Sequence, residues 1–355
     1  MSKPLLILIA AACCSVPFAQ AQSVTTESVG FNKITCLANS DTIVGVPLRK
    51  QGSISTKLTA TPSATTGNVT LTLANTELPT LAKHFLKFNS GNRDGRWYDI
   101  LSNTASTVTI DLNGDNLDGV LSGDSVLIAE YWTLDTLFPP AQATTNPATT
   151  GHAIVASSSV LSRKTELLLP NLTGQGTNLA PSATYYITSN VWKKFGDTTR
   201  PSFGDVILYP DNYFIVRHNS TVTQSTVFKS IGEIEAKNFS IFLSTRASGK
   251  QDNFIGLPRP VAVKLVDLGL DETAFVNSPS TLARKDELLV FNNDAAIRNK
   301  APSATYYRLA AGWRKFNDGS TDHNNTTIPA GAGFLIRKAA TATGASVLWK
   351  NTSAY

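Results

Sequence analysis

Four carboxylates stand at matching places in the chain and could carry acid–base chemistry. Glu166 and Glu287 form one pair, and Asp197 and Asp318 form the other. A glycosidase needs one carboxyl group as acid and another as base or nucleophile, about 5–10 Å apart. Each of these residues, however, lies in a motif that occurs twice, and an ion pair at a strand edge recurs wherever its fold recurs. A structural role is therefore favoured, and a polysaccharide-active enzyme with paired carboxylates is the alternative.

The histidines and acidic turns give little sign of a metal site. No two of the four histidines lie at metal-ligand spacing, and His-Glu-x-x-His is absent. Residues 111–118 (DLNGDNLD) resemble the start of a calcium loop, with oxygen ligands at every second position. Asn116 replaces the glycine of an EF-hand and Ser122 replaces its bidentate glutamate, so an ordinary turn is favoured. Calcium binding by this loop is left open.

Motifs for cofactors and for an activated nucleophile are missing. The chain has no Gly-x-Ser-x-Gly element, no phosphate-binding P-loop and no Gly-x-Gly-x-x-Gly fingerprint. We therefore predict that the protein is not an enzyme. No catalytic residue, metal site or cofactor is assigned.

Aromatic side chains interleaved with cations offer a possible binding surface. Such rings could stack on sugars or anchor a protein interface. In a tandem Tyr-Tyr on a strand, one ring faces the core and the other faces outward. Support of the core and sheet is the competing explanation. The candidate residues are Trp192, Lys193, Trp313, Arg314, Tyr186 and Tyr307.

Internal repetition is the strongest pattern in the sequence, and it shows how these residues must be positioned. Residues 161–169 (LSRKTELLL) match residues 282–290 (LARKDELLV). At the same offset APSATYY recurs, and WKKFGD is followed by WRKFND. Upstream, DTIVGVP at residues 41–47 resembles DNFIGLP at residues 252–258. Two homologous halves are therefore predicted, with a long insertion in the first.

The strand pattern predicts an all-β protein. Val69, Leu71 and Leu73 alternate with threonines, and a similar alternation follows from Val108 to Leu112. Only residues 78–87 hint at a short helix. The expected architecture is two β-sandwich-like halves in tandem, the first carrying a small β-barrel-like insert. The predicted domains are a signal peptide (1–21), a first repeat (22–54 and 139–235), an inserted β domain (55–138) and a second repeat (236–355).

The first residues predict export. Lys3 precedes an apolar stretch, and Ala19-Gln20-Ala21 fits a cleavage site. The stretch is too short for a membrane span, and the residues before Cys13 and Cys14 do not favour lipid attachment. Cleavage leaves Cys36 without an intrachain partner, so burial in a core is expected. The protein is predicted to be secreted, periplasmic or on the outer cell surface, since no hydrophobic tail follows the last strand.

Composition and charge narrow the classes of partner. Charged residues make up only 16% of the chain, which excludes a coiled coil or α-solenoid. The formal net charge of +5 is spread evenly, so no nucleic-acid partner is predicted. No later run is apolar enough to span a membrane. The partner is unknown, and an extracellular or envelope polysaccharide or protein is the expected class.

The order of the repeated motifs resembles one family. It is an uncharacterised family of exported proteins, present in many copies in Verrucomicrobia-type bacteria. Residues 95–98 (GRWY), 111–115 (DLNGD) and 131–134 (YWTL) of the insert also look like that family. The resemblance covers nearly the whole chain after the signal. It implies export and an all-β fold, with no assigned activity.

These observations favour an exported, non-enzymatic binding or structural protein of the cell surface or extracellular space. Two alternatives stay open at this stage. One is the polysaccharide-active enzyme, and the other is a subunit that self-assembles into a surface layer or fibre.

Overall fold

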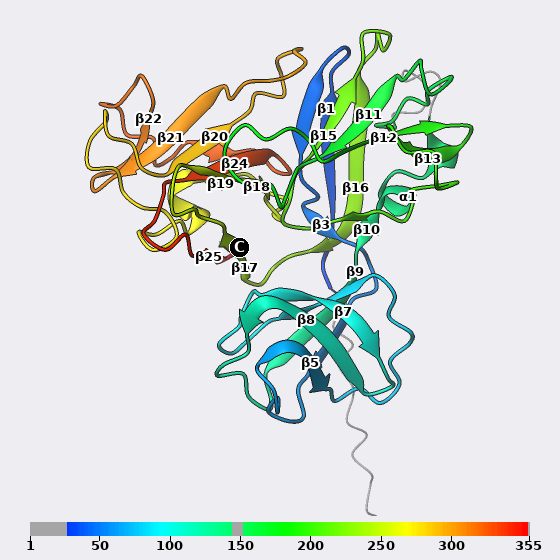
Figure 1. Ribbon diagram of the computed structural model, residues 1–355, viewed down its shortest axis with the longest axis vertical. Helices are drawn as coiled ribbons and strands as arrows, with labels where there is room; N and C mark the ends of the chain where they lie inside the picture. Colours follow the sequence, from blue (N-terminus) through cyan, green and yellow to red (C-terminus); the bar gives the residue numbers. More distant parts are fainter. Residues whose placement is uncertain (1–26, 144–151, 354–355) are drawn as a thin grey trace, which may run out of the picture.

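The computed structural model describes residues 27–143 and 152–353, and it is all-β (Figure 1). The predicted signal peptide lies outside the described residues. Three lobes are visible in Figure 1. We call residues 29–49 and 132–234 the first lobe, residues 54–130 the insert and residues 239–351 the second lobe.

The first lobe is a sandwich of two antiparallel sheets. One sheet has the order β13-β12-β11-β15-β2, and the other has the order β1-β16-β3. Trp192, Phe214 and Phe228 fill the core between them, together with the buried Cys36. Burial raises the pKa of the Cys36 thiol to about 11. The elements are β1 (Val29–Cys36), β2 (Asp41–Val44), β3 (Leu48–Arg49), β10 (Trp132–Thr133), α1 (Leu134–Leu137), η1 (Pro140–Gln142), β11 (Thr165–Leu169), β12 (Ala183–Thr188), β13 (Val191–Lys194), β14 (Ile207–Leu208), β15 (Phe214–His218) and β16 (Thr226–Ile234).

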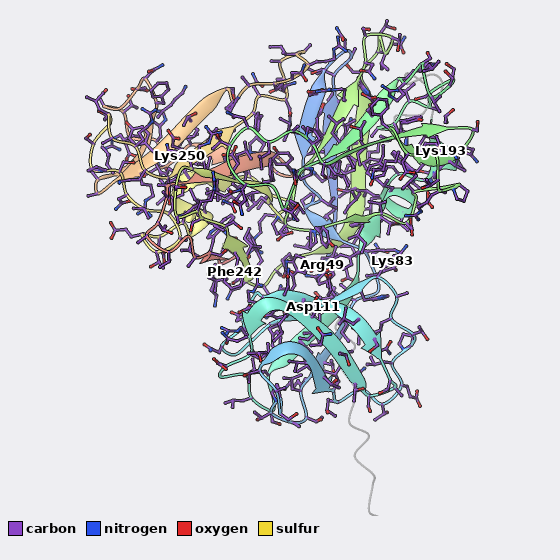
Figure 2. The ribbon with its side chains drawn as sticks, viewed as in Figure 1. Arg49, Lys83, Asp111, Lys193, Phe242 and Lys250 are labelled. Carbon is purple, nitrogen blue, oxygen red and sulfur yellow. The ribbon has the colours of Figure 1, made fainter. Side chains whose placement is uncertain are left out.

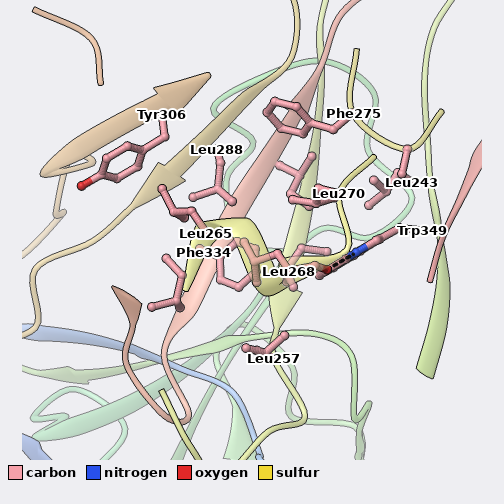
Figure 3. Close-up of a cluster of buried hydrophobic side chains, with 14 of the residues drawn as sticks. Leu243, Leu257, Leu265, Leu268, Leu270, Phe275, Leu288, Tyr306, Phe334 and Trp349 are labelled. Carbon is pink, nitrogen blue, oxygen red and sulfur yellow. Dashed lines mark hydrogen bonds between the residues drawn. The ribbon is translucent and has the colours of Figure 1, made fainter. Parts of the chain in front are cut away.

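The second lobe has a similar plan. Its main sheet has the order β18-β24-β20-β21-β22, and β17 pairs with β25. Figure 3 shows the core, where the indole nitrogen of Trp349 donates to the Leu268 carbonyl oxygen at 2.8 Å. The elements are β17 (Phe239–Leu243), β18 (Gln251–Gly256), β19 (Val263–Lys264), η2 (Leu265–Leu268), β20 (Glu287–Val290), β21 (Ala304–Leu309), β22 (Gly312–Lys315), β23 (Thr327–Ile328), β24 (Gly333–Lys338) and β25 (Val347–Asn351).

The two five-stranded sheets correspond strand for strand. The order β13-β12-β11-β15-β2 in the first lobe corresponds to the order β22-β21-β20-β24-β18 in the second. In both sheets the strand that comes first in the sequence lies at one edge, beside the strand that comes last. The registers also correspond, because Glu166 pairs with Arg217 and Glu287 pairs with Arg337. The common origin of the two lobes stays a prediction, which this correspondence supports.

The insert is one six-stranded sheet, in the order β4-β9-β6-β7-β8-β5. A bridge between Leu58 and Leu73 joins its two edges, so the sheet curls into a closed, barrel-like form. Alternation puts Val69 and Leu71 inside, as the sequence predicts. The hint of a helix at residues 78–87 is wrong, because β6 begins at His84. The strands are β4 (Ile54–Lys57), β5 (Thr66–Thr72), β6 (His84–Phe88), β7 (Trp97–Asn103), β8 (Thr107–Asn116) and β9 (Ser125–Glu130).

The two lobes clamp each other reciprocally. Arg217 holds Asp41 through two 2.7 Å bonds, and the carboxylate also accepts from the backbone of Asn299 in the other lobe at 2.7 Å. Arg337 holds Asp252 in the same way, and Asp252 accepts from the backbone of Asn178 at 2.8 Å. Each lobe thus inserts a loop into a carboxylate–guanidinium pair of the other.

A close backbone approach between the lobes explains one repeated glycine. Gly45 and Gly256 occupy the same place in their motifs, and they face each other across the interface. A β-carbon on Gly45 would lie 2.7 Å from the α-carbon of Gly256, and one on Gly256 would lie 3.0 Å from that of Gly45. Only residues without a side chain fit here.

Candidate functional site

The predicted aromatic surface is not accessible. Trp192, Trp313, Tyr186 and Tyr307 are all buried. The indole nitrogen of Trp192 donates to the Phe138 carbonyl oxygen at 3.2 Å. The prediction that these four rings form a contact surface is therefore wrong, because strand alternation does not reveal which loops and side chains cover the outer face of a sheet.

The two cations of that prediction remain on the surface, partly exposed. Lys193 donates to the Pro201 carbonyl oxygen at 2.7 Å. Arg314 donates to the Trp313 carbonyl oxygen and lies 3.7 Å from Asp322. Both side chains are therefore positioned by neighbouring groups of their own lobe. Figure 2 shows Lys193 on the outer part of the first lobe.

Two exposed rings stand at the ends of the motifs that begin with Trp192 and Trp313. Phe195 is 58% exposed and Phe316 is 44% exposed. A guanidinium group lies over each ring, Arg163 at 4.3 Å from the Phe195 centroid and Arg284 at 4.2 Å from the Phe316 centroid. Cation–π contacts of this kind fix both partners in one orientation.

Each arginine ties its ring to the adjoining loop and strand. Arg284 donates to a Glu287 carboxylate oxygen at 2.8 Å and to the Thr281 carbonyl oxygen at 3.5 Å. Arg163 makes the matching contacts with Glu166 and with the Val160 carbonyl oxygen. The repeated Arg-Lys-x-Glu motif therefore serves to build the same surface arrangement twice.

The leucine that opens this motif is almost fully exposed in both lobes. Leu161 is 92% exposed and Leu282 is 94% exposed. Scattered exposed leucines are normal, but here each stands two residues before an arginine that lies over an exposed ring, at equivalent positions in both lobes. We define the first patch as Leu161, Arg163, Glu166, Lys193 and Phe195, and the second patch as Leu282, Arg284, Glu287, Arg314 and Phe316.

The candidate carboxylates are committed to local partners. Burial alone would raise the pKa of Glu287, but the bonds from Lys250 and Arg284 outweigh it and lower the pKa below its usual value. Hydrogen bonds from Thr199 lower the pKa of Asp197, and those from Thr321 lower the pKa of Asp318. These three groups lack the raised pKa that a general acid needs.

In the loop at residues 111–118, Asp111 and Asp115 accept hydrogen bonds from groups of the protein itself. Asp115 accepts from the Tyr98 hydroxyl at 2.8 Å and from Arg96 at 3.2 Å. Asp111 accepts from the backbone of Asn113 at 2.8 Å, which makes an Asx turn. Within residues 27–143 and 152–353, no group of three or more His, Cys, Asp or Glu residues could hold a metal. These contacts favour the turn over the calcium loop.

A buried charge cluster lies at the meeting point of the three lobes, and no sequence pattern points to it. Arg49 and Lys87 approach the same Glu235 oxygen, at 2.7 Å and 2.6 Å. Burial lowers the pKa of Lys87 to about 8, although Glu235 opposes the shift. The adjoining cavity of about 30 Å³ has room for one or two water molecules. The cluster therefore acts as a joint, and its members lie too far apart in the sequence to be recognised together.

Aromatic side chains complete this joint on the side of the first lobe. Trp97 of the insert stacks on Tyr209, with centroids 5.9 Å apart, and Tyr131 meets Tyr209 edge to face at 5.6 Å. Burial raises the pKa of the neighbouring Asp211 to about 6. The insert is thus packed firmly against the rest of the molecule.

The comparisons with known proteins give no relative. No family model, curated protein or solved structure matches the chain. In the part of the chain that the structure describes, no helix has the length and apolar character needed to cross a membrane.

Proposed function

We propose that the protein is an exported, non-enzymatic binding protein of the cell surface or extracellular space, and that it contacts its target through the first and second patches. The observation that carries this proposal is the exposed leucine, stacked arginine and exposed phenylalanine, built in the same way on both lobes. The predicted signal and the family resemblance support an extracytoplasmic place of action.

The energetic argument concerns the exposed apolar groups. Covering a leucine or phenylalanine contributes about 1.5–3 kcal/mol per side chain. Neither Leu161 nor Leu282 contributes to a core of its own lobe, since both are almost fully exposed. Contact with another molecule would bury both side chains. Two equivalent contacts on one chain favour a target with repeated features.

A binding experiment with matched variants tests this proposal. The chain from Gln22 onward is screened against envelope and matrix polysaccharides and proteins by pull-down and glycan array. Leu161→Ser combined with Leu282→Ser should lose at least about tenfold in affinity, because apolar burial is lost at both patches. Leu121→Ser, at a 59% exposed leucine of the insert, is the control and should bind normally. A blank screen, or equal binding by the double variant, would contradict the proposal.

A further inference from the structure

A hollow beside the second patch has the chemistry of a ligand site. It is lined by Phe316, Arg284, Glu287, Lys250, Arg337, Leu289 and Thr305. Thr177 from the first lobe completes the wall, so both lobes contribute to the hollow. Figure 2 shows Lys250 on the second lobe, away from the insert. Junctions between lobes are common places for ligand sites.

Positive charge predominates in this hollow. Glu287 receives both Arg284 and Lys250, the latter at 2.7 Å, so one carboxylate faces two cations. Arg337 is paired with Asp252, whose side chain is fully buried. The three cations exceed the two carboxylates by one positive charge. The carboxylate oxygens already accept hydrogen bonds from these cations. An incoming group would therefore meet N–H donors and a net positive potential, which favours an anion.

A platform and hydrogen-bonding groups adjoin these cations. Phe316 presents a ring beneath Arg284, and the wall includes Thr177 and Thr305, whose side chains carry hydroxyl groups. An apolar ring beside cations and hydroxyls suits a ligand that combines an apolar face, hydroxyl groups and negative charge. A sugar unit with a carboxylate or sulfate group has all three.

We propose that this hollow binds an acidic sugar unit of a polysaccharide, with the sugar face on Phe316 and the anionic group toward Lys250 and Arg284. This inference rests on the proposed binding function and names its ligand class. The hollow is open to solvent, so it can accept a unit within a long chain as well as a chain end.

The first lobe supplies its extra cation differently. The residue that corresponds to Lys250 is Asn39, whereas the residue that corresponds to Thr177 is Arg298. Arg298 is exposed and precedes Asn299, which contacts the Asp41–Arg217 pair. Where the second lobe has the cation Lys250, the first lobe has the neutral Asn39, and the cation is supplied instead by Arg298 on the loop of the second lobe. The fold therefore already accommodates asparagine at the position equivalent to Lys250.

Affinity measurements on the chain from Gln22 onward test the inference. The probes are polygalacturonate for carboxylated sugars, dextran sulfate for sulfated sugars and dextran as the neutral polymer. The wild-type protein should bind at least one acidic polymer, more weakly as salt rises, and should bind dextran at least tenfold less well. Lys250→Asn and Phe316→Ala should each lose about fivefold to tenfold in affinity, as expected for one charge-assisted contact or one ring. Lys229→Asn removes the same charge from an exposed site on β16 and should change the affinity less than twofold.

The outcomes separate this inference from the proposed function. Equal binding of acidic polymers by wild type, Lys250→Asn and Phe316→Ala overturns the acidic-sugar site. The acidic-sugar site is also overturned if the protein binds only dextran or a protein. If the variant with Leu161→Ser and Leu282→Ser loses that binding, the proposed binding function still stands. Melting temperatures within about 2 °C of wild type confirm that the variants are folded, since both substituted side chains are at least partly exposed.

Discussion

At the C-terminal end of β15 the first lobe holds a buried histidine, and at the same place on β24 the second lobe holds a buried lysine. His218 lies between two threonine hydroxyls, 2.9 Å from Thr165 and 2.8 Å from Thr226. Thr226 in turn donates to the Ala153 carbonyl oxygen at 2.9 Å. Burial lowers the pKa of His218 to about 4, so the imidazole is neutral near pH 7.

The second lobe uses an ion pair for the same purpose. Lys338 donates to Asp286, which stands where the first lobe has Thr165, and to the Ala274 carbonyl oxygen at 2.6 Å. Asp286 also accepts from the backbone of Val276 at 2.8 Å and of Ala339 at 2.7 Å. Lys338 and Asp286 are both fully buried.

In both lobes the requirement is set by a backbone group and not by the side chains. Ala153 and Ala274 occupy equivalent positions, and each carbonyl oxygen needs a buried donor. A neutral relay through Thr226 and a direct ammonium group both supply one. Removing one partner should have different effects in the two lobes. A buried charge left without a partner lowers the free energy of unfolding far more than a buried hydroxyl left without one.

The largest expected effect comes from breaking the ion pair. Lys338→Met leaves Asp286 charged and buried, and it should lower the free energy of unfolding by about 3–5 kcal/mol in urea denaturation. Lys350→Met removes a partly exposed lysine 3.0 Å from Asp94 and should cost about 1 kcal/mol or less. Equal costs for the two variants would contradict the role assigned to the buried pair.

The histidine should make the first lobe sensitive to acid. Its pKa is about 4 when folded and 6.5 as the ordinary value, so the unfolded chain binds a proton between these values that the folded chain does not. Its contribution is therefore complete above about pH 6.5 and falls by about 3 kcal/mol on going down to pH 4.

His218→Gln removes this titration. The measurement is the free energy of unfolding of both proteins from pH 7 to pH 4, because carboxylates that titrate in the same range cancel in the difference. Parallel curves for wild type and variant would show that His218 is not a neutral buried group.

A smaller loss is expected when the relay is cut at its far end. Thr226→Val removes the hydroxyl that links His218 to Ala153, and it should cost about 1–3 kcal/mol in thermal or urea unfolding. Thr226→Ser keeps the hydroxyl and should recover most of that loss. If the serine and valine variants are equally unstable, packing rather than hydrogen bonding explains the threonine.

The smallest effects should distinguish the two surface patches. Arg284→Ala leaves Glu287 paired with Lys250, whereas Arg163→Ala removes the ion pair of Glu166. Both should cost about 1 kcal/mol or less, with the larger loss for Arg163→Ala. A larger loss for Arg284→Ala in urea unfolding would contradict the role given to Lys250.

The sequence predicted the fold better than the surface. The all-β class followed from alternation such as that of Val69 and Leu71, which reports directly on strand faces. The predicted surface included the buried Trp192 and not the exposed Phe195, because periodicity assigns a side chain to a face and says nothing about what covers that face.

The joint and the exchanged ion pair could not be predicted for a related reason. Arg49 belongs to the first lobe, Lys87 to the insert and Glu235 to the segment that leads into the second lobe, so they meet only in three dimensions. The replacement of Thr165 and His218 by Asp286 and Lys338 is visible as a mismatch within the repeat, but its meaning depends on burial and on the shared carbonyl partner.

The reciprocal clamps between the lobes have a consequence for length. Because Asp41 and Asp252 each grip a loop of the opposite lobe, the separation of the first and second patches is fixed rather than adjustable. If both patches bind as proposed, a polymer with units at that spacing gains a high effective concentration for its second contact, and one with a different spacing gains none. The protein would then select its target by the distance between repeating units.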